Sequence, residues 1–145
     1  MADAIVQNYK NILDAKAGLT QWKQDDKPIY PLVLTLEDWF LISPKVVQQL
    51  QQHVLRLLLH ESIPESILDE MPYTVASSHE FELTSQVISQ VGIATVMCKK
   101  TNLENRSWCL LPFVQGAFKD AMKQVDGRLF PEDFQRLFVN APNSD

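Results

Sequence analysis

The chain has 145 residues, of which 46% are hydrophobic and 21% charged, and its formal net charge is −5. This composition is typical of a globular protein that buries its own core, and it predicts a single domain over residues 1–145. An acidic chain offers no general basic face, which argues against a nucleic-acid binder. A second interpretation, in which these residues are the C-terminal domain of a longer protein, stays open at this stage.

The distribution of apolar residues and cysteines predicts the cellular compartment. No apolar stretch reaches the length of a membrane span, and the first residues lack the basic and apolar regions of a signal peptide. Cys98 and Cys109 are too few for a disulfide framework, and their spacing matches no metal-binding pattern. The sequence therefore predicts a cytoplasmic protein with two reduced cysteines and no membrane segment.

Helical and extended segments alternate through the first half of the chain. Apolar residues at helical spacing predict an amphipathic helix over residues 3–17. A turn-bounded apolar run over residues 29–36 predicts a first strand. The serine–proline pair at residues 43–44 predicts the start of a long second helix, because serine caps and proline suits the first helical position. One or two helical turns are expected over residues 64–70, and a short second strand over residues 72–76.

The second half of the chain is predicted to be mostly helical. Ser77 and Glu80 have the spacing of a capping box, which marks the start of a third helix. Residues 93–98 fit either a third strand or a short helix, since their β-branched content and their position favour different structures. Residues 107–125 are expected to form a helix that bends at Pro112. A last helical segment is expected to begin at Pro131.

The order of these elements predicts the fold class. Strands that alternate with helices favour an α/β or α+β domain, rich in helix, with a small sheet of two to four strands flanked by helices. The run over residues 29–36 has neither a helical period nor a polar alternation. Such a run is typical of a strand that is buried on both faces.

Few residues are candidates for catalysis. Glu37 and Asp38 end the first predicted strand, where α/β proteins often place functional groups, and they are the candidate catalytic residues. We favour the alternative, a structural role at the start of a helix, where the dipole stabilises acids. The chain lacks a glycine-rich nucleotide motif, a nucleophile elbow and an H-E-x-x-H zinc motif. No cofactor and no metal site are predicted.

Histidine and cysteine side chains offer two further options. His53 and His60 lie seven residues apart on the second predicted helix, so they share roughly one face, as two metal ligands would. Solvated helix histidines are the favoured interpretation. Cys109 lies in an apolar stretch, where cysteine commonly acts as a small hydrophobic residue and not as a nucleophile.

The chain is rich in tryptophan for its length, with Trp22, Trp39 and Trp108. Trp22 and Trp39 are the candidates for a partner-binding surface, because exposed aromatic residues commonly anchor protein interfaces. Core anchors are the favoured alternative. The expected partner is another protein or the rest of a longer chain, and the sequence does not indicate an oligomeric state.

One stretch of the chain resembles a known family. The segment PIYPLVLTLEDW over residues 28–39 precedes a long predicted helix, and MPYTV (71–75), EFE (80–82) and VGI (91–93) follow. In this order they resemble the α/β portion that follows the catalytic core in uncharacterised proteins with a restriction-endonuclease-like, PD-(D/E)XK fold. The resemblance covers about residues 27–95. It implies that the apolar strand occupies a sheet position beyond the active site of such a protein.

The catalytic motif of that family does not fall on a strand of this chain. Its chemistry requires an acidic residue and a D/E-x-K strand that together hold a divalent ion. Here D/E-x-K occurs at Asp14–Lys16, on a predicted helix, and at Asp25–Lys27, in a predicted loop. No catalytic residue is therefore carried over from the family.

Three functions are compatible with these observations, and the first is favoured. The chain is a non-catalytic α/β domain for assembly or protein interaction within a larger, nuclease-related protein. A second hypothesis is a small stand-alone regulator that binds protein through the region of Trp22 and Trp39. A third is a metal-dependent, nuclease-like hydrolase that uses Asp25, Lys27, Glu37 or Asp38 at the strand ends.

Overall fold

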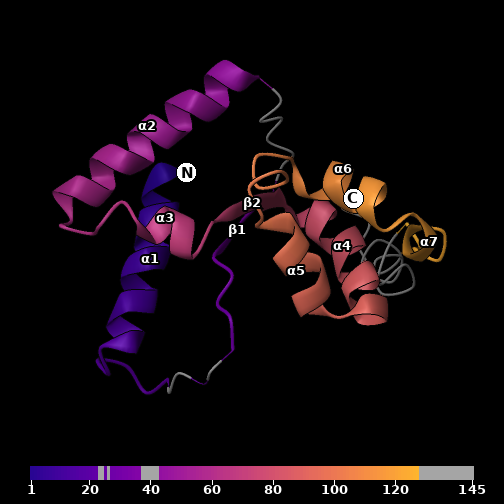
Figure 1. The fold of residues 1–145 in the computed structure, drawn as a ribbon, viewed down its shortest axis with the longest axis horizontal. Coiled ribbons are helices and arrows are strands. Elements are labelled where there is room, and N and C mark those ends of the chain that lie inside the picture. Colours follow the sequence, from indigo (N-terminus) through magenta and orange to yellow (C-terminus); the bar gives the residue numbers. More distant parts are fainter. Residues whose placement is uncertain (23–24, 26, 37–42, 128–145) are drawn as a thin grey trace, which may run out of the picture.

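The computed structural model describes residues 1–22, 25, 27–36 and 43–127. Within these ranges the chain forms seven helices and one two-stranded parallel sheet (Figure 1). It is a helix-rich single domain with a small sheet packed against helices, which confirms the predicted fold class. The elements are, in chain order, α1 (Ala2–Lys16), β1 (Leu32–Thr35), α2 (Pro44–His60), α3 (Ile67–Glu70), β2 (Thr74–Ser77), α4 (Ser78–Val91), α5 (Ile93–Lys100), α6 (Leu110–Ala117) and α7 (Lys119–Met122).

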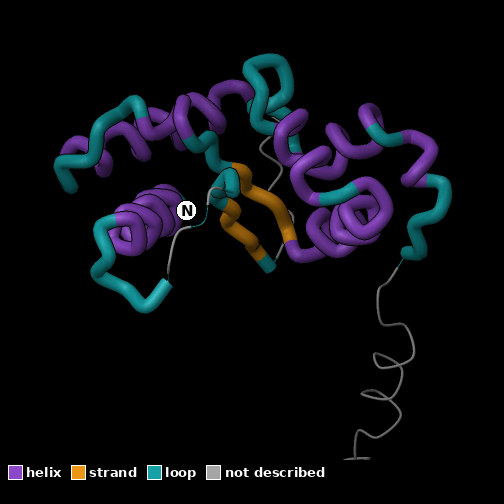
Figure 2. Tube along the Cα trace, turned by 60° about the horizontal axis from the view of Figure 1, so that its bottom comes forward, coloured by secondary structure: helices purple, strands orange, loops and turns teal. Residues whose placement is uncertain are grey.

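The sheet lies between two groups of helices. Helices α1 to α3 lie on one side of it and helices α4 to α7 on the other, as both views show (Figures 1 and 2). We call these groups the α1–α3 layer and the α4–α7 layer. The strands pair in parallel from Leu32 opposite Thr74 to Thr35 opposite Ser77, and α2 and α3 form the connection between them. None of the helices in the described ranges is long and apolar enough to cross a membrane.

Each layer has its own hydrophobic core, and the strands contribute to both. Successive side chains of a strand point to opposite faces of the sheet. Accordingly, Val33 and Val75 pack with buried residues of the α1–α3 layer, which include Ile5, Tyr9, Val54 and Leu58. Their neighbours Leu32 and Ala76 join the other core, which includes Val87, Val96, Leu110 and Phe113. The two strands therefore form a wall between two cores.

Capping residues set the helix boundaries around β2 as the sequence predicts. The Ser77 hydroxyl accepts a hydrogen bond from the Glu80 N–H at 3.1 Å, and the Ser77 N–H donates to the Glu80 carboxylate at 3.0 Å. This capping box starts α4 directly at the end of β2. Gly92 ends α4 with a φ of 88°, a conformation that favours glycine. Residues 93–98, which the sequence left open, belong to helix α5.

Two expectations from the sequence are wrong in detail. The strand over residues 29–36 is not buried on both faces, since Leu34 is 49% and Leu36 93% exposed. A sheet of two strands is too narrow for helices to cover both faces along their whole length. The helix over residues 107–125 breaks at Phe118 and not at Pro112. Pro112 lies in the first turn of α6, where a missing N–H costs nothing.

Tyr9 ties the α1–α3 layer to the chain that enters β2. Its side chain is fully buried, and its hydroxyl donates a hydrogen bond to the Met71 carbonyl at 2.7 Å. Burial raises the pKa of Tyr9 above its ordinary value, so the phenol stays protonated and keeps this role as a donor. The contact joins residues that are 62 positions apart in the sequence.

We expect Tyr9→Phe to lower the free energy of unfolding by about 1–2 kcal/mol, because a buried carbonyl loses its donor while the packing is retained. Tyr30→Phe is the matched control, since its hydroxyl contacts the exposed Cys98 thiol at 3.0 Å. Urea unfolding of both variants measures the difference. Equal losses in the two variants would show that the Tyr9 hydrogen bond contributes nothing specific.

Candidate functional site

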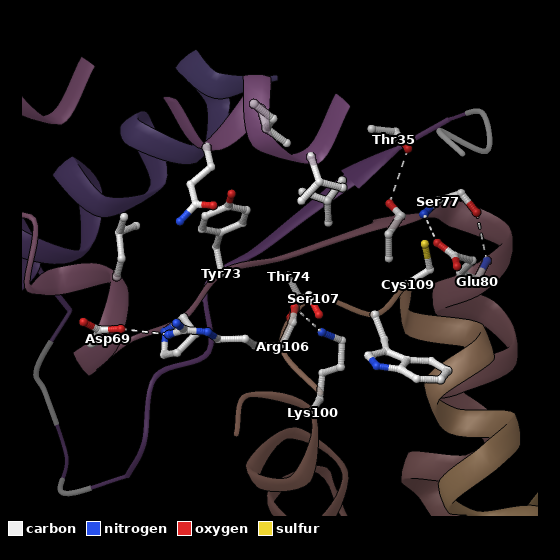
Figure 3. Close-up of a pocket in the computed structure, with 18 of the residues that line it drawn as sticks. Thr35, Asp69, Tyr73, Thr74, Ser77, Glu80, Lys100, Arg106, Ser107 and Cys109 are labelled. Atoms are coloured by element: carbon white, nitrogen blue, oxygen red, sulfur yellow. Dashed lines mark hydrogen bonds and ion pairs between the residues drawn. The ribbon is translucent and has the colours of Figure 1, made fainter. Parts of the chain in front are cut away.

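A cleft with a volume of about 340 Å³ runs along strand β2 (Figure 3). All residues from 72 to 77 line it, and we call it the β2 cleft. One wall comes from α2 and α3 of the first layer. The other comes from the end of α5 and from residues 106–109, which belong to the 101–109 loop between α5 and α6. The cleft therefore lies where the two helical layers separate.

The cleft follows the unpaired edge of β2. Thr74 and Val75 point to opposite faces of the sheet, yet both line the cavity, as expected for a space that passes around the strand edge. The Thr74 N–H donates to the Pro31 carbonyl at 2.9 Å, so Thr74 faces the ladder. In a parallel ladder the next residue then directs its N–H and C=O to the other side. No third strand pairs there in the described chain, so Val75 presents both groups to the cleft.

The wall on the side of α2 and α3 combines three apolar side chains with the polar side chains of Gln51, Glu65 and Asp69. Val47 and Leu50 from α2 and Leu68 from α3 line the cleft, and all three side chains are half-buried. Their positions follow from the helical period, because Val47, Leu50 and Val54 share the face of α2 that turns inward. The apolar part of this wall, formed by these three residues, can accept an apolar side chain.

Lys100 forms the centre of the opposite wall. It is the last residue of α5, only 1% of its surface is exposed, and its Nζ donates to the Asn105 carbonyl at 3.3 Å and the Arg106 carbonyl at 3.0 Å. These bonds fix the 101–109 loop against the strand. Burial lowers the pKa of Lys100 to about 8, and electrostatic interactions with the Cys109 and Glu80 side chains oppose this shift.

Thr74 supplies an unpartnered hydroxyl beside Lys100. The residue is 3% exposed, and within the described ranges its Oγ1 has no hydrogen-bond partner. Figure 3 shows the amine end of Lys100 directed toward Thr74 and Ser107. Buried polar groups of a folded protein are normally hydrogen-bonded, and an orphan costs about 1–3 kcal/mol. The site therefore retains donor capacity that the folded chain does not use.

Glu80 and Cys109 lie side by side at the carboxyl end of β2 (Figure 3). The Glu80 carboxylate accepts from the Ser77 N–H at 3.0 Å and from the Leu111 N–H at 3.3 Å, so it caps α4 and also joins α4 to α6. Burial raises the pKa of the Cys109 thiol, and the charge of Glu80 raises it further. Cys109 is therefore a neutral thiol and a poor nucleophile at physiological pH.

An ion pair crosses one end of the cleft. Arg106 from the 101–109 loop and Asp69 from α3 approach to 2.8 Å (Figure 3). The two side chains keep 40% and 77% of their surface exposed, so the pair adds little to stability. Trp108, on the same loop, is 58% exposed, although core positions were the favoured interpretation of the tryptophans.

Of the four site residues predicted from the sequence, only Trp22 lies in the described part of the chain. Trp22 is 45% exposed but does not line the cavity, and Glu37, Asp38 and Trp39 lie outside the described residues. His53 and His60 on α2 are both exposed, which agrees with their interpretation as solvated residues. Across the described ranges, no group of three or more acidic, histidine or cysteine side chains could hold a metal ion.

Sequence analysis missed Lys100, although a signal for it was present. Lys100 follows the buried Val96 by four positions, so it lies on the inward face of α5. A lysine on the apolar face of a helix is unusual and marks a buried amine. Thr74 carried no such signal, because threonine is common in strands.

Comparisons of the chain with models of known protein families, with curated proteins and with solved structures found no match. The β2 cleft is therefore interpreted from its own geometry and chemistry.

The lowered pKa of Lys100 makes stability depend on pH in a defined window. The unfolded chain keeps this proton up to its ordinary pKa of 10.5, whereas the folded chain loses it near pH 8. Between these values the unfolded state binds more protons, so the free energy of unfolding rises with pH.

We expect wild type to gain about 2 kcal/mol of stability relative to Lys100→Met between pH 7 and pH 9.5. Urea unfolding of both proteins at the two pH values tests this, because tyrosine titration affects both equally. A difference that stays constant with pH would contradict a buried, titrating Lys100.

Proposed function

We propose that this chain is a non-catalytic protein-interaction domain, and that it binds an extended segment of a partner polypeptide along the free edge of β2. The observation that carries this proposal is the free edge of β2, where the ladder register directs the Val75 N–H and C=O away from β1 and where Val75 lines a cleft of about 340 Å³. A peptide that pairs with this edge would extend the sheet by one strand. Main-chain hydrogen bonds would supply affinity, and the two walls would supply specificity.

The size and position of the β2 cleft suit a short peptide. Its volume falls at the lower end of the range for ligand sites, so it accommodates a few side chains of an extended chain. The free edge is short, because β2 has four residues and its ends are already occupied. Ser77 donates to Glu80, and the Tyr73 backbone interacts with the Tyr9 hydroxyl. Val75 is therefore the point at which a partner strand would bond.

The polar groups of the cleft favour binding over catalysis. Glu80 is held by two backbone N–H groups, Cys109 is a neutral thiol, and Lys100 is bound to two carbonyls. A general base or nucleophile needs a free lone pair directed at a substrate. The hydrolase hypothesis would depend on Asp25, Lys27, Glu37 or Asp38. Membership in a larger, nuclease-related protein stays a prediction of the sequence resemblance.

A phage-displayed library of random nonapeptides, selected on the full chain, tests this function. We expect selected peptides to slow hydrogen exchange of the Val75 amide, because that N–H becomes bonded to the peptide. Val75→Pro removes the donor, and an edge position tolerates proline. We therefore expect it to weaken the selected peptides at least tenfold while the unfolding transition is retained.

N-methylation of alternate residues of the selected peptide provides a second measurement that does not depend on the folding of the variant. Methylation at the residue whose N–H donates to the Val75 carbonyl should abolish binding, whereas methylation at the residues on either side of it, whose N–H groups point away from β2, should not. Selected peptides that bind without protecting the Val75 amide would overturn the proposed function.

A further inference from the structure

We propose that the β2 cleft recognises an aliphatic residue next to an acidic residue in the bound segment. The aliphatic side chain would face the wall of α2 and α3, and the acidic one would face Lys100, Thr74 and Ser107. This inference rests on the proposed function and adds the chemistry of the partner. It follows from the strand geometry, because an added strand continues the pleat of β2 and its successive side chains point to opposite faces.

The first face of the cleft accepts an aliphatic side chain. Val47, Leu50 and Leu68 are half-buried there and lie on the same side of the sheet as Val75. A leucine, isoleucine or valine of the partner would remove apolar surface of both molecules from water. An acidic side chain would lose its hydration there and would meet the carboxylates of Glu65 and Asp69, which line the same wall.

The second face offers unused hydrogen-bond donors. A lysine ammonium has three donors, and two of those of Lys100 are bound to backbone carbonyls. Thr74 is only 3% exposed, and its hydroxyl has no acceptor within the described chain. Both groups lie on the side of the sheet that Ser107 lines (Figure 3). These donors match an acceptor-only group of the partner.

Charge selects a carboxylate among the possible acceptors. The Lys100 amine donates to two neutral carbonyls, and burial makes its charge costly. The Glu80 carboxylate lies close enough to act on Lys100, but its oxygens are bound by the N–H groups of Ser77 and Leu111. An aspartate or glutamate of the partner would supply a charge-assisted bond to the amine, which is stronger than a bond from an amide side chain.

Sequencing of the nonapeptides selected on the full chain tests the predicted pattern. We expect Leu, Ile or Val beside Asp or Glu. Replacement of that acidic residue by its amide should weaken binding about tenfold, in keeping with the loss of a charge-assisted bond. Replacement of the aliphatic residue by alanine should weaken binding by a similar factor.

Two pairs of matched variants locate the two faces. Leu50→Asp should weaken peptide binding at least tenfold, whereas Leu59→Asp on the same helix should not, because Leu59 is 80% exposed and does not line the cleft. Thr74→Val should remove a donor to the acidic residue. Thr84→Val is its control, since Thr84 is equally buried, also lacks a partner for its Oγ1 within the described ranges, and lies away from the cleft.

The outcomes separate this inference from the proposed function. Peptides that protect the Val75 amide but show no acidic preference, or that bind Thr74→Val and Thr84→Val equally, overturn the inference and leave the function intact. Peptides that protect no amide of β2 overturn both. Loss of binding in Leu50→Asp and Thr74→Val, with wild-type affinity in both controls, supports the inference.

Discussion

The alternation of side chains along two short strands is the constraint on which the rest of this structure depends. Because neighbouring residues of β1 and β2 point to opposite faces, the same four-residue strands supply Val33 and Val75 to one core and Leu32 and Ala76 to another. The helices before and after β2 therefore pack on different sides of the sheet and make few direct contacts with each other. A third strand at β2 would close the gap between the layers. In the described chain that edge stays unpaired, and the β2 cleft is the result.

The 101–109 loop is positioned by a buried charge and not by apolar packing. Lys100 holds the loop through the carbonyls of Asn105 and Arg106, and the Arg106–Asp69 pair joins it to α3. A methionine of similar volume would avoid the desolvation of the ammonium, so this arrangement is an inefficient way to fix a loop. Under the proposed function the buried amine has a second role, because the remaining donor of Lys100 would bind an acidic residue of the partner in the cleft. The unpartnered hydroxyl of Thr74 on the same side of the strand supports this interpretation.

Sequence signals within a few neighbouring residues predicted most helices and strands, but they could not predict the β2 cleft. The capping box of Ser77 and Glu80 and the stop at Gly92 depend on neighbouring residues, so they are visible in the sequence. The cleft depends on residues from α2, β2 and α5, whose meeting is set by packing between distant segments. Apolar content led to a wrong prediction of burial in two places. The run around Leu34 suggested full burial, and Trp108 was favoured as a core residue, yet the narrow sheet and the loop leave both exposed. The burial of Lys100 could have been predicted, because this lysine interrupts the apolar face of α5 four positions after Val96.

Thr74 and Thr84 illustrate why a stability cost alone does not mark a functional site. Both hydroxyls are buried without a partner in the described structure, and each costs folding free energy in the same way. Thr84 lies within the α4–α7 core, where valine would fill the same space, so its hydroxyl has no use that the surroundings indicate. Thr74 lies on the wall of a cleft, beside an amine with unused donor capacity and one residue from an open strand edge. The proposed binding site therefore rests on three features that meet in one cleft: the Thr74 hydroxyl, the remaining donor of Lys100 and the free edge of β2 at Val75.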